Sequence, residues 1–222
     1  MEAELPGRQG RLAFAFAYLV VNRSRPVTRD ELTDALWKEP ASSDRLSPLL
    51  SKLRSVVPLD GRGEVRLVLP DAAWIDVEAA AEGLHRAESA VAQRDYTGAW
   101  APGRVAQHVA IRGFLPGEDA PWIDAQRRRL EEVLIRSLEL VGRACLEIGG
   151  GELDTAERSA RTLIARASYR ESGHRLLMET LAARGNAAEA LLVYEELRQL
   201  LREELGAAPS AQTQELHRRL LG

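Results

Sequence analysis

The side chains of this chain that are best suited to chemistry lie on one predicted helix that ends near Val57. Its polar face combines basic and hydroxyl groups, which hydrogen-bond to base edges and to phosphates. That face consists of Arg45, Ser47, Ser51, Lys52 and Arg54. The opposite face carries Leu46, Leu49, Leu50 and Leu53, a spacing typical of a helix packed on a core. The pattern predicts binding to double-stranded DNA in its major groove. A small packed helical subdomain with an ordinary charged surface would account for it equally well.

Other polar residues flank this helix on both sides in the sequence. Arg62 and Arg66 fall on a predicted β-hairpin, and Arg25 and Arg29 lie beside the preceding helix. Their guanidinium groups are expected to reach phosphates next to the groove. Thr28 lies among them at the start of that preceding helix, and we include it in the candidate DNA-binding set.

No motif in the sequence indicates catalysis or metal binding. It contains no phosphate-binding loop, no serine nucleophile elbow and no pair of histidines four residues apart. The single cysteine, Cys145, falls on an apolar helix face and is expected to be a small buried residue. His174 and His217 lie beside arginines and are expected to be solvated. We therefore expect no enzymatic activity, no metal site and no cofactor.

The first predicted helix covers residues 9–21. Its apolar run, Leu12–Val21, is ten residues long, whereas a membrane span needs about 20. Glu2 and Glu4 spoil the positive start of a signal peptide, and the residues after the run make a poor cleavage site. We expect a buried helix and no contact with membranes.

The rest of the first third predicts two more helices and a hairpin. After the first helix we expect a turn over 22–27, a helix capped by Thr28 and Glu31, a loop over 38–44, the basic helix described above, and a β-hairpin. The basic helix should begin near 45–47, because Pro48 has no N–H and fits only into a first turn. The hairpin should pair a strand over 64–69 with a return strand at 74–75.

Everything after Asp76 has helical periodicity. The first stretch covers 77–92, and the second covers 96–111 and is interrupted at Pro102 and Gly103. A helix from about 121 to 148 ends at three consecutive glycines. Asp154 and Ser168 resemble caps of two further helices.

The tail contains a weak internal repeat. Leu146 and Leu181 precede two glycine turns and lie 35 residues apart, while Ala156 and Ala188 follow those turns and lie 32 apart. A period near 34 residues with helix–turn–helix content is typical of tetratricopeptide repeats. An unrelated helical bundle is the alternative.

The charge pattern fits two units. The chain has 30 basic and 33 acidic residues, and its first 70 residues are slightly basic while the remainder is acidic. A run at 127–129 is entirely arginine. Glu131 and Glu132 follow it at helical spacing, so we expect pairing along one wet helix face rather than a DNA contact.

Several motifs resemble one family of bacterial regulators. Residues 5–12, Tyr18-Leu-Val, 25–32, Asp34-Ala-Leu-Trp and 49–54 look like the winged helix of the SARP family (Streptomyces antibiotic regulatory proteins). Pro121-Trp122, Arg129-Leu-Glu-Glu, 174–178, 188–191, 194–198, 203–206 and 209–220 resemble the bacterial transcriptional activator domain that follows it.

The resemblance implies a cytoplasmic transcription regulator that binds promoter DNA. It implies that residues 47–54 read the major groove, that 62–74 form the wing, and that the loop over 38–44 can face RNA polymerase. The helical domain would then serve as a homodimer contact, a polymerase contact or a sensor.

We therefore expect a mainly α protein, with a small winged helix-turn-helix at 1–76 and a tetratricopeptide-like helical domain at 77–222. The expected function is a DNA-binding transcriptional regulator, most simply an activator. The alternative is a protein-interaction or ligand-sensing adaptor that keeps the fold without binding DNA.

Overall fold

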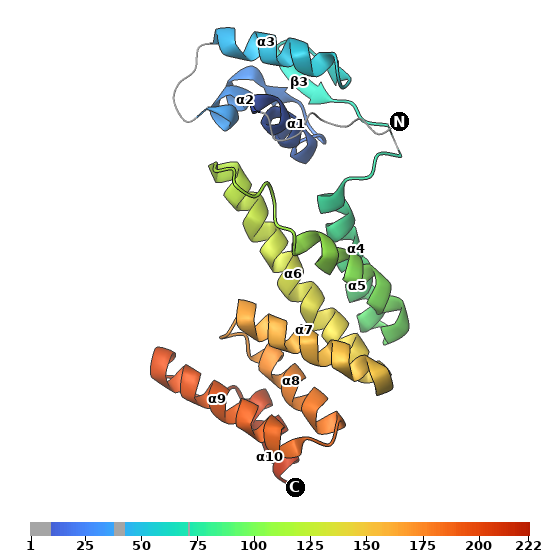
Figure 1. The fold of residues 1–222 in the computed structure, drawn as a ribbon, viewed down its shortest axis with the longest axis vertical. Helices are drawn as coiled ribbons and strands as arrows, with labels where there is room; N and C mark the ends of the chain where they lie inside the picture. The colour runs from blue at the N-terminus through green and yellow to red at the C-terminus, as the bar shows by residue number, and fades with distance from the viewer. Residues whose placement is uncertain (1–9, 38–42, 71) are drawn as a thin grey trace. The chain divides into compact units, whose positions relative to one another are not determined.

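The computed structural model describes residues 10–37, 43–70 and 72–222. The chain divides into two compact units, one formed by 1–73 with 118–124 and the other by 74–117 with 125–222. The described residues are mostly helical and contain one small three-stranded sheet (Figure 1). The predicted fold class, a winged helix-turn-helix followed by tetratricopeptide-like helices, is confirmed.

Three helices form the first unit with the sheet. They are α1 (Arg11–Val21), α2 (Arg29–Leu36) and α3 (Ser43–Arg54). Their shared core contains side chains with almost no exposure, namely Leu19, Leu32, Leu36, Leu46, Leu50, Leu53 and Val65. The capping box is confirmed, since the Thr28 hydroxyl accepts the Glu31 backbone N–H at 3.2 Å.

The sheet differs from the predicted hairpin. Strand β3 (Glu64–Leu67) pairs antiparallel with β2 (Leu59–Asp60) on one edge and with β1 (Val27–Thr28) on the other. Both edges are therefore occupied, and the expected return strand at 74–75 is wrong. A tight turn makes the β2–β3 pairing possible: Gly61 has a φ of +80°, and a Cβ there would lie 2.1 Å from the Glu64 carbonyl oxygen.

Helix α3 begins earlier than Pro48 suggests. It starts at Ser43, so Pro48 lies inside the helix, and the expected start near 45–47 is wrong. The ring costs one backbone hydrogen bond. Three fully buried leucines, Leu46, Leu50 and Leu53, hold the helix against the core all the same. Residues 43–44 of the expected loop are helical, and 38–42 lie outside the described residues.

The beginning of α6 (Pro121–Ile148) belongs to the first unit. There the Trp122 ring meets the rings of Phe14 and Tyr18 edge-on, with centroid distances of 5.2 Å and 5.1 Å. Its indole N–H also donates to the Ala35 carbonyl at 3.2 Å. Edge-on aromatic contacts stabilise beyond the area that they bury, so a residue from the middle of the chain completes the first core.

The second unit starts with the helix pair α4 (Asp76–Ala92) and α5 (Tyr96–Ala110). Gly83 lets these helices approach closely, since a Cβ there would lie 2.6 Å from the Pro102 carbonyl oxygen. The interruption expected at Pro102 and Gly103 is wrong, because α5 is continuous through both. Its start is secured by Asp95, whose carboxylate accepts the Gly98 N–H at 2.9 Å.

The remaining elements stack as helical hairpins. They are η1 (Gly150–Glu152), α7 (Leu153–Arg166), α8 (Glu171–Ala183), α9 (Ala187–Leu205) and α10 (Ala211–Leu221). Apolar side chains of α7 to α10 form one cluster, namely Ala160, Leu176, Leu177, Met178, Leu181, Ala190, Val193 and Leu216. Cys145 is buried, as expected, and burial raises the pKa of its thiol to about 11. No helix in the described parts of the chain is long and apolar enough to cross a membrane.

Two polar predictions for this unit are wrong. His174 is buried instead of solvated, because its ring lies under the turn before α8, where Nε2 is 2.9 Å from the Ser168 carbonyl oxygen. Asp154 and Ser168 do not occupy the cap positions of α7 and α8, which are Glu152 and Arg170. Both residues make other contacts in the structure: Asp154 pairs with Arg184 at 2.5 Å, and the Ser168 carbonyl oxygen lies beside His174.

The arginine run at the start of α6 is used differently than expected. Arg127 donates to the carbonyl oxygens of Phe114 and Leu115, at 3.0 Å and 2.7 Å. Glu131 pairs with Arg166 at 3.2 Å, and Glu132 pairs with Arg170 at 3.4 Å. The two glutamates therefore bind arginines from the next helical hairpin.

Glu171 attaches the last helix. Its carboxylate accepts the backbone N–H of Ser210 at 3.0 Å and the Ser210 hydroxyl at 2.6 Å. These bonds, together with that of Thr213, lower the pKa of Glu171 against the opposing effect of burial. A carboxylate of α8 thus supplies the cap that the start of α10 needs.

Candidate nucleic-acid interface

Helix α3 presents the predicted polar face to solvent. Arg45, Ser47, Ser51, Lys52 and Arg54 are all exposed. Leu46, Leu50 and Leu53 are fully buried on the other side. The structure therefore brings the five α3 candidates together on one accessible surface, and burial of the leucines fixes which way that surface faces.

Two hydrogen bonds tie this face to its neighbours. Arg29 of α2 donates to the Ser47 hydroxyl oxygen at 2.7 Å, and Arg54 donates to the Gly61 carbonyl oxygen at 2.6 Å. The first bond joins the helices of the helix-turn-helix, and the second joins α3 to the β2–β3 turn. Arg29 and Arg54 thus help to position the face, and each guanidinium keeps further N–H donors for a ligand.

Arg45, Lys52 and Arg62 are the uncommitted cations of the candidate set. All three are exposed, and within the described residues none of them forms an ion pair. Arg45 and Lys52 lie seven residues apart on α3, about two helical turns. A free cation can exchange its water for a phosphate or a base edge without first breaking an internal pair.

Arg66 and Thr28 lie on adjacent parts of the sheet. Arg66 is exposed on β3, and its Nε donates to the Arg23 carbonyl oxygen at 3.4 Å. Thr28 pairs with Glu64 of the same strand. The pairing of β1 with β3 therefore places the residues before α2 beside the hairpin, which the sequence did not indicate.

Arg25 is committed to an internal network. It donates to the Glu31 carboxylate, to the Asn22 side chain at 3.0 Å and to the Pro26 carbonyl oxygen at 3.2 Å. Glu31 also accepts the Tyr18 hydroxyl at 2.7 Å. Hydrogen bonding from Arg25 is the main cause that lowers the pKa of Glu31 to about 2, while burial and the bond to Glu31 raise the pKa of Tyr18 to about 12.

Replacement of Glu31 by glutamine should make the first unit less sensitive to acid. A carboxylate with a lowered pKa stabilises the folded state above its unfolded pKa of about 4.5, and this contribution disappears as pH falls toward 2. We expect E31Q to cost about 1 kcal/mol at pH 7, because the network is partly exposed. Urea unfolding followed by circular dichroism from pH 7 to pH 2.5 checks this. Equal slopes with pH below 4.5 for both proteins would contradict the role of Glu31.

Trp122 is the residue of this unit that sequence reasoning missed. It lies 87 residues after Ala35, whose carbonyl it binds, and no local pattern joins two such positions.

Among the described residues, no group of three or more histidine, cysteine and acidic side chains could hold a metal ion.

The fold and this face together define a winged-helix protein whose basic helix is presented to solvent beside a hairpin. The chain belongs to the family described as bacterial transcriptional activator domain, which matches residues 75–221. The family match thus covers the helical unit that follows the winged helix.

Two curated relatives resemble nearly the whole chain. The regulatory protein AfsR of Streptomyces griseus is 33% identical over 215 residues, which is 91% of this chain and 21% of that protein. Regulatory protein AfsR of Streptomyces coelicolor is 33% identical over 214 residues, again 21% of its length. The chain therefore spans about a fifth of the length of these relatives.

A solved structure shares the fold. It is Mycobacterium tuberculosis EmbR in complex with a low affinity phosphopeptide, with a TM-score of 0.77 and 24% identity. The alignment covers 98% of this chain and 60% of that one. The likeness extends over both units, so the winged helix and the helical domain occur in the same order there.

Proposed function

We propose that this chain regulates transcription by binding promoter DNA through its first unit. In this proposal α3 enters the major groove, Arg45 and Lys52 contact base edges or phosphates, and Arg62 and Arg66 contact the adjacent backbone. The observation that carries the proposal is the exposed face of α3 with two uncommitted cations. The family match and the regulatory relatives support it independently.

The remaining candidates act mainly through position. Arg29 and Arg54 hold α3 against α2 and the hairpin turn while offering spare donors, and Ser47 and Ser51 supply short hydroxyl arms. Arg25 supports the turn before α2 and is the weakest candidate for a direct contact, because its bonds to Glu31 would compete with a phosphate. We further infer that the helical unit makes the protein contacts of an activator, with a second copy of the chain or with RNA polymerase.

Selection of bound duplexes from fragmented genomic DNA tests the DNA function. A selected duplex should bind with an affinity that falls as salt rises, because each neutralised phosphate releases counterions. We expect a slope of about −0.9 in log K against log salt for each phosphate contact, measured by fluorescence anisotropy between about 50 and 200 mM salt. Failure to enrich any duplex, or a slope near zero, would overturn the proposal and favour an adaptor that does not bind DNA.

A further inference from the structure

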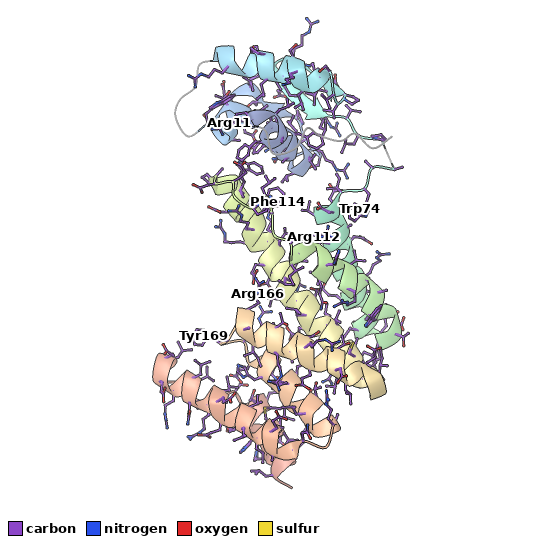
Figure 2. The ribbon with its side chains drawn as sticks, in the orientation of Figure 1. Arg11, Trp74, Arg112, Phe114, Arg166 and Tyr169 are labelled. Atoms are coloured by element: carbon purple, nitrogen blue, oxygen red, sulfur yellow. The ribbon has the colours of Figure 1, made fainter. Side chains whose placement is uncertain are left out.

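Helices α6, α8 and α10 line a groove in the second unit. Its larger hollow has a volume of about 460 Å³, within the range of about 300–1,000 Å³ that is usual for small-molecule sites. An adjoining hollow of about 250 Å³ shares Arg143, Glu179, Leu216 and Arg219 with it. Figure 2 shows the side chains that project from these helices. Because the two hollows share these residues, we treat them as one site and call it the α6–α8–α10 groove.

The floor of this groove is apolar. Leu216 of α10 is buried, while Leu146 of α6 and Leu220 of α10 are half-buried and pack against the apolar cluster of α7 to α10. Ala182 of α8 also lines the larger hollow. Each of the three helices therefore contributes to the floor, which exists only while they are stacked. An aliphatic side chain laid on this floor would lose contact with water, which favours binding.

Charged side chains of both signs surround the floor. Arg143 donates to the Glu179 carboxylate at 2.7 Å and pairs with Glu147 at 2.8 Å. Arg219 lies 3.9 Å from the other oxygen of Glu179. The larger hollow thus has two arginines and two glutamates, and the adjoining one adds one residue of each sign. A ligand with a single charge would meet like charges as often as opposite ones, whereas a zwitterion can place each of its charges beside an opposite one.

The loose pair of Arg219 and Glu179 is the part of the groove most open to a ligand. The Arg219 side chain is 63% exposed and that of Glu179 is 28% exposed. Their separation of 3.9 Å is too long for a hydrogen bond, so the guanidinium keeps donors and the carboxylate keeps lone pairs for a ligand. The two charges of an α-amino acid are separated by a similar distance. The two charges at the ends of an extended peptide are not.

We propose that the α6–α8–α10 groove binds a small zwitterion of the class of the aliphatic α-amino acids. The ligand lies antiparallel to the loose pair, with its carboxylate on Arg219 and its ammonium on Glu179 beside Glu147. Its side chain covers Leu146 and Leu220. The groove includes no candidate DNA-binding residue, so this inference does not depend on the proposed contact with promoter DNA.

Titration of the full 222-residue chain with valine, leucine and methionine tests the site. Chemical shifts in ¹H–¹⁵N NMR spectra report binding. For a ligand of so few atoms we expect a Kd of about 0.1 to 10 mM for at least one of the three. Two analogues of leucine test the recognition of charge, namely 4-methylpentanoate, which lacks the ammonium, and 3-methylbutylamine, which lacks the carboxylate. Each should bind at least about tenfold more weakly than leucine, because one charge of the loose pair stays without a partner.

Two substitutions separate the roles of the two charges. Arg219→Ala should weaken the binding of both leucine and 4-methylpentanoate at least about fivefold, since both need the guanidinium. Glu147→Gln should weaken only the binding of leucine, by at least about threefold, because 4-methylpentanoate has no ammonium. The matched control is Arg218→Ala, which alters the next residue of α10. Arg218 pairs with Glu215 on its own helix and does not line the groove, so the Kd should stay within about twofold.

A second readout is the thermal stability of the chain. A ligand that contacts all three helices binds only their stacked state, so saturating leucine should raise the melting temperature of the unaltered chain and not that of the Arg219→Ala variant. Circular dichroism establishes that each variant is folded, and Arg219→Gln replaces Arg219→Ala if that variant unfolds.

The proposal is overturned if none of the three amino acids gives saturable shifts up to about 20 mM. It is equally overturned if the Arg219 variant binds leucine as tightly as the unaltered chain, or if both analogues bind as tightly as leucine. Duplex binding measured on the same samples separates the two proposals. A chain that binds DNA and no amino acid contradicts only the groove, and a chain that binds an amino acid and no duplex contradicts only the DNA function.

Discussion

A chain in which Arg45 and Lys52 are both replaced by alanine should lose most of its affinity for a selected duplex. A good base contact is worth about 1–3 kcal/mol, so the two together should cost about 2–6 kcal/mol, or at least about 30-fold in Kd. If either side chain binds a phosphate instead, the salt slope should become shallower by about 1 for that residue. Fluorescence anisotropy with a labelled duplex at several salt concentrations measures both effects.

The matched control replaces Arg158 and Arg218, which removes the same charge from α7 and α10. It should leave the Kd within about twofold, since screening limits the reach of distant charges. Arg54→Ala should affect the fold as well as duplex binding. It also removes the donor of the Gly61 carbonyl oxygen and so loosens the turn beside α3. If R45A/K52A binds the duplex as tightly and with the same salt slope as the unaltered chain, the exposed face of α3 is not the DNA-binding surface.

Replacement of Trp122 by alanine should destabilise the first unit by about 2–4 kcal/mol, somewhat less than for a completely buried tryptophan. The change removes both edge-on ring contacts and leaves the Ala35 carbonyl without its indole donor. Urea unfolding followed by far-UV circular dichroism measures the loss without depending on tryptophan fluorescence. Trp122→Phe should recover part of the stability, because a smaller ring keeps some of the aromatic contact.

Trp74→Ala is the control for the same measurement. Trp74 is 69% exposed, so its removal should change the free energy of unfolding by no more than about 0.5 kcal/mol. Equal effects of the two substitutions would mean that Trp122 does not belong to the first core. DNA binding offers a second readout, since loss of Trp122 should weaken it only where the unit begins to unfold.

Local patterns in the sequence were enough to locate most of the helices and the buried face of α3. The leucine stripe of α3 and the capping box at Thr28 each depend on residues within a few positions of one another. Among the boundaries that failed, the one at Pro48 failed because packing of three leucines outweighs one lost hydrogen bond. The burial of His174 under its preceding turn was equally invisible, since it depends on how neighbouring helices stack.

Contacts between distant segments could not be predicted. Nothing near Val27 indicates that it pairs with Val65, and this pairing closes the edge that a return strand at Trp74 would have needed. The candidate site shows the same division. Its five residues on α3 follow from periodicity, whereas the bonds from Arg29 to Ser47 and from Arg54 to Gly61 come only from the folded arrangement.

Pro48 has one more consequence for α3. Because a proline lacks the N–H that would bind the carbonyl at position 44, the opening turn of this helix is fastened less firmly than the two turns behind it. Arg45 lies in this less firmly held first turn, and Lys52 lies in the regular turns that follow it. If α3 enters a major groove as proposed, the turn that carries Lys52 would set the register, and the turn that carries Arg45 could adjust to local variations in groove width.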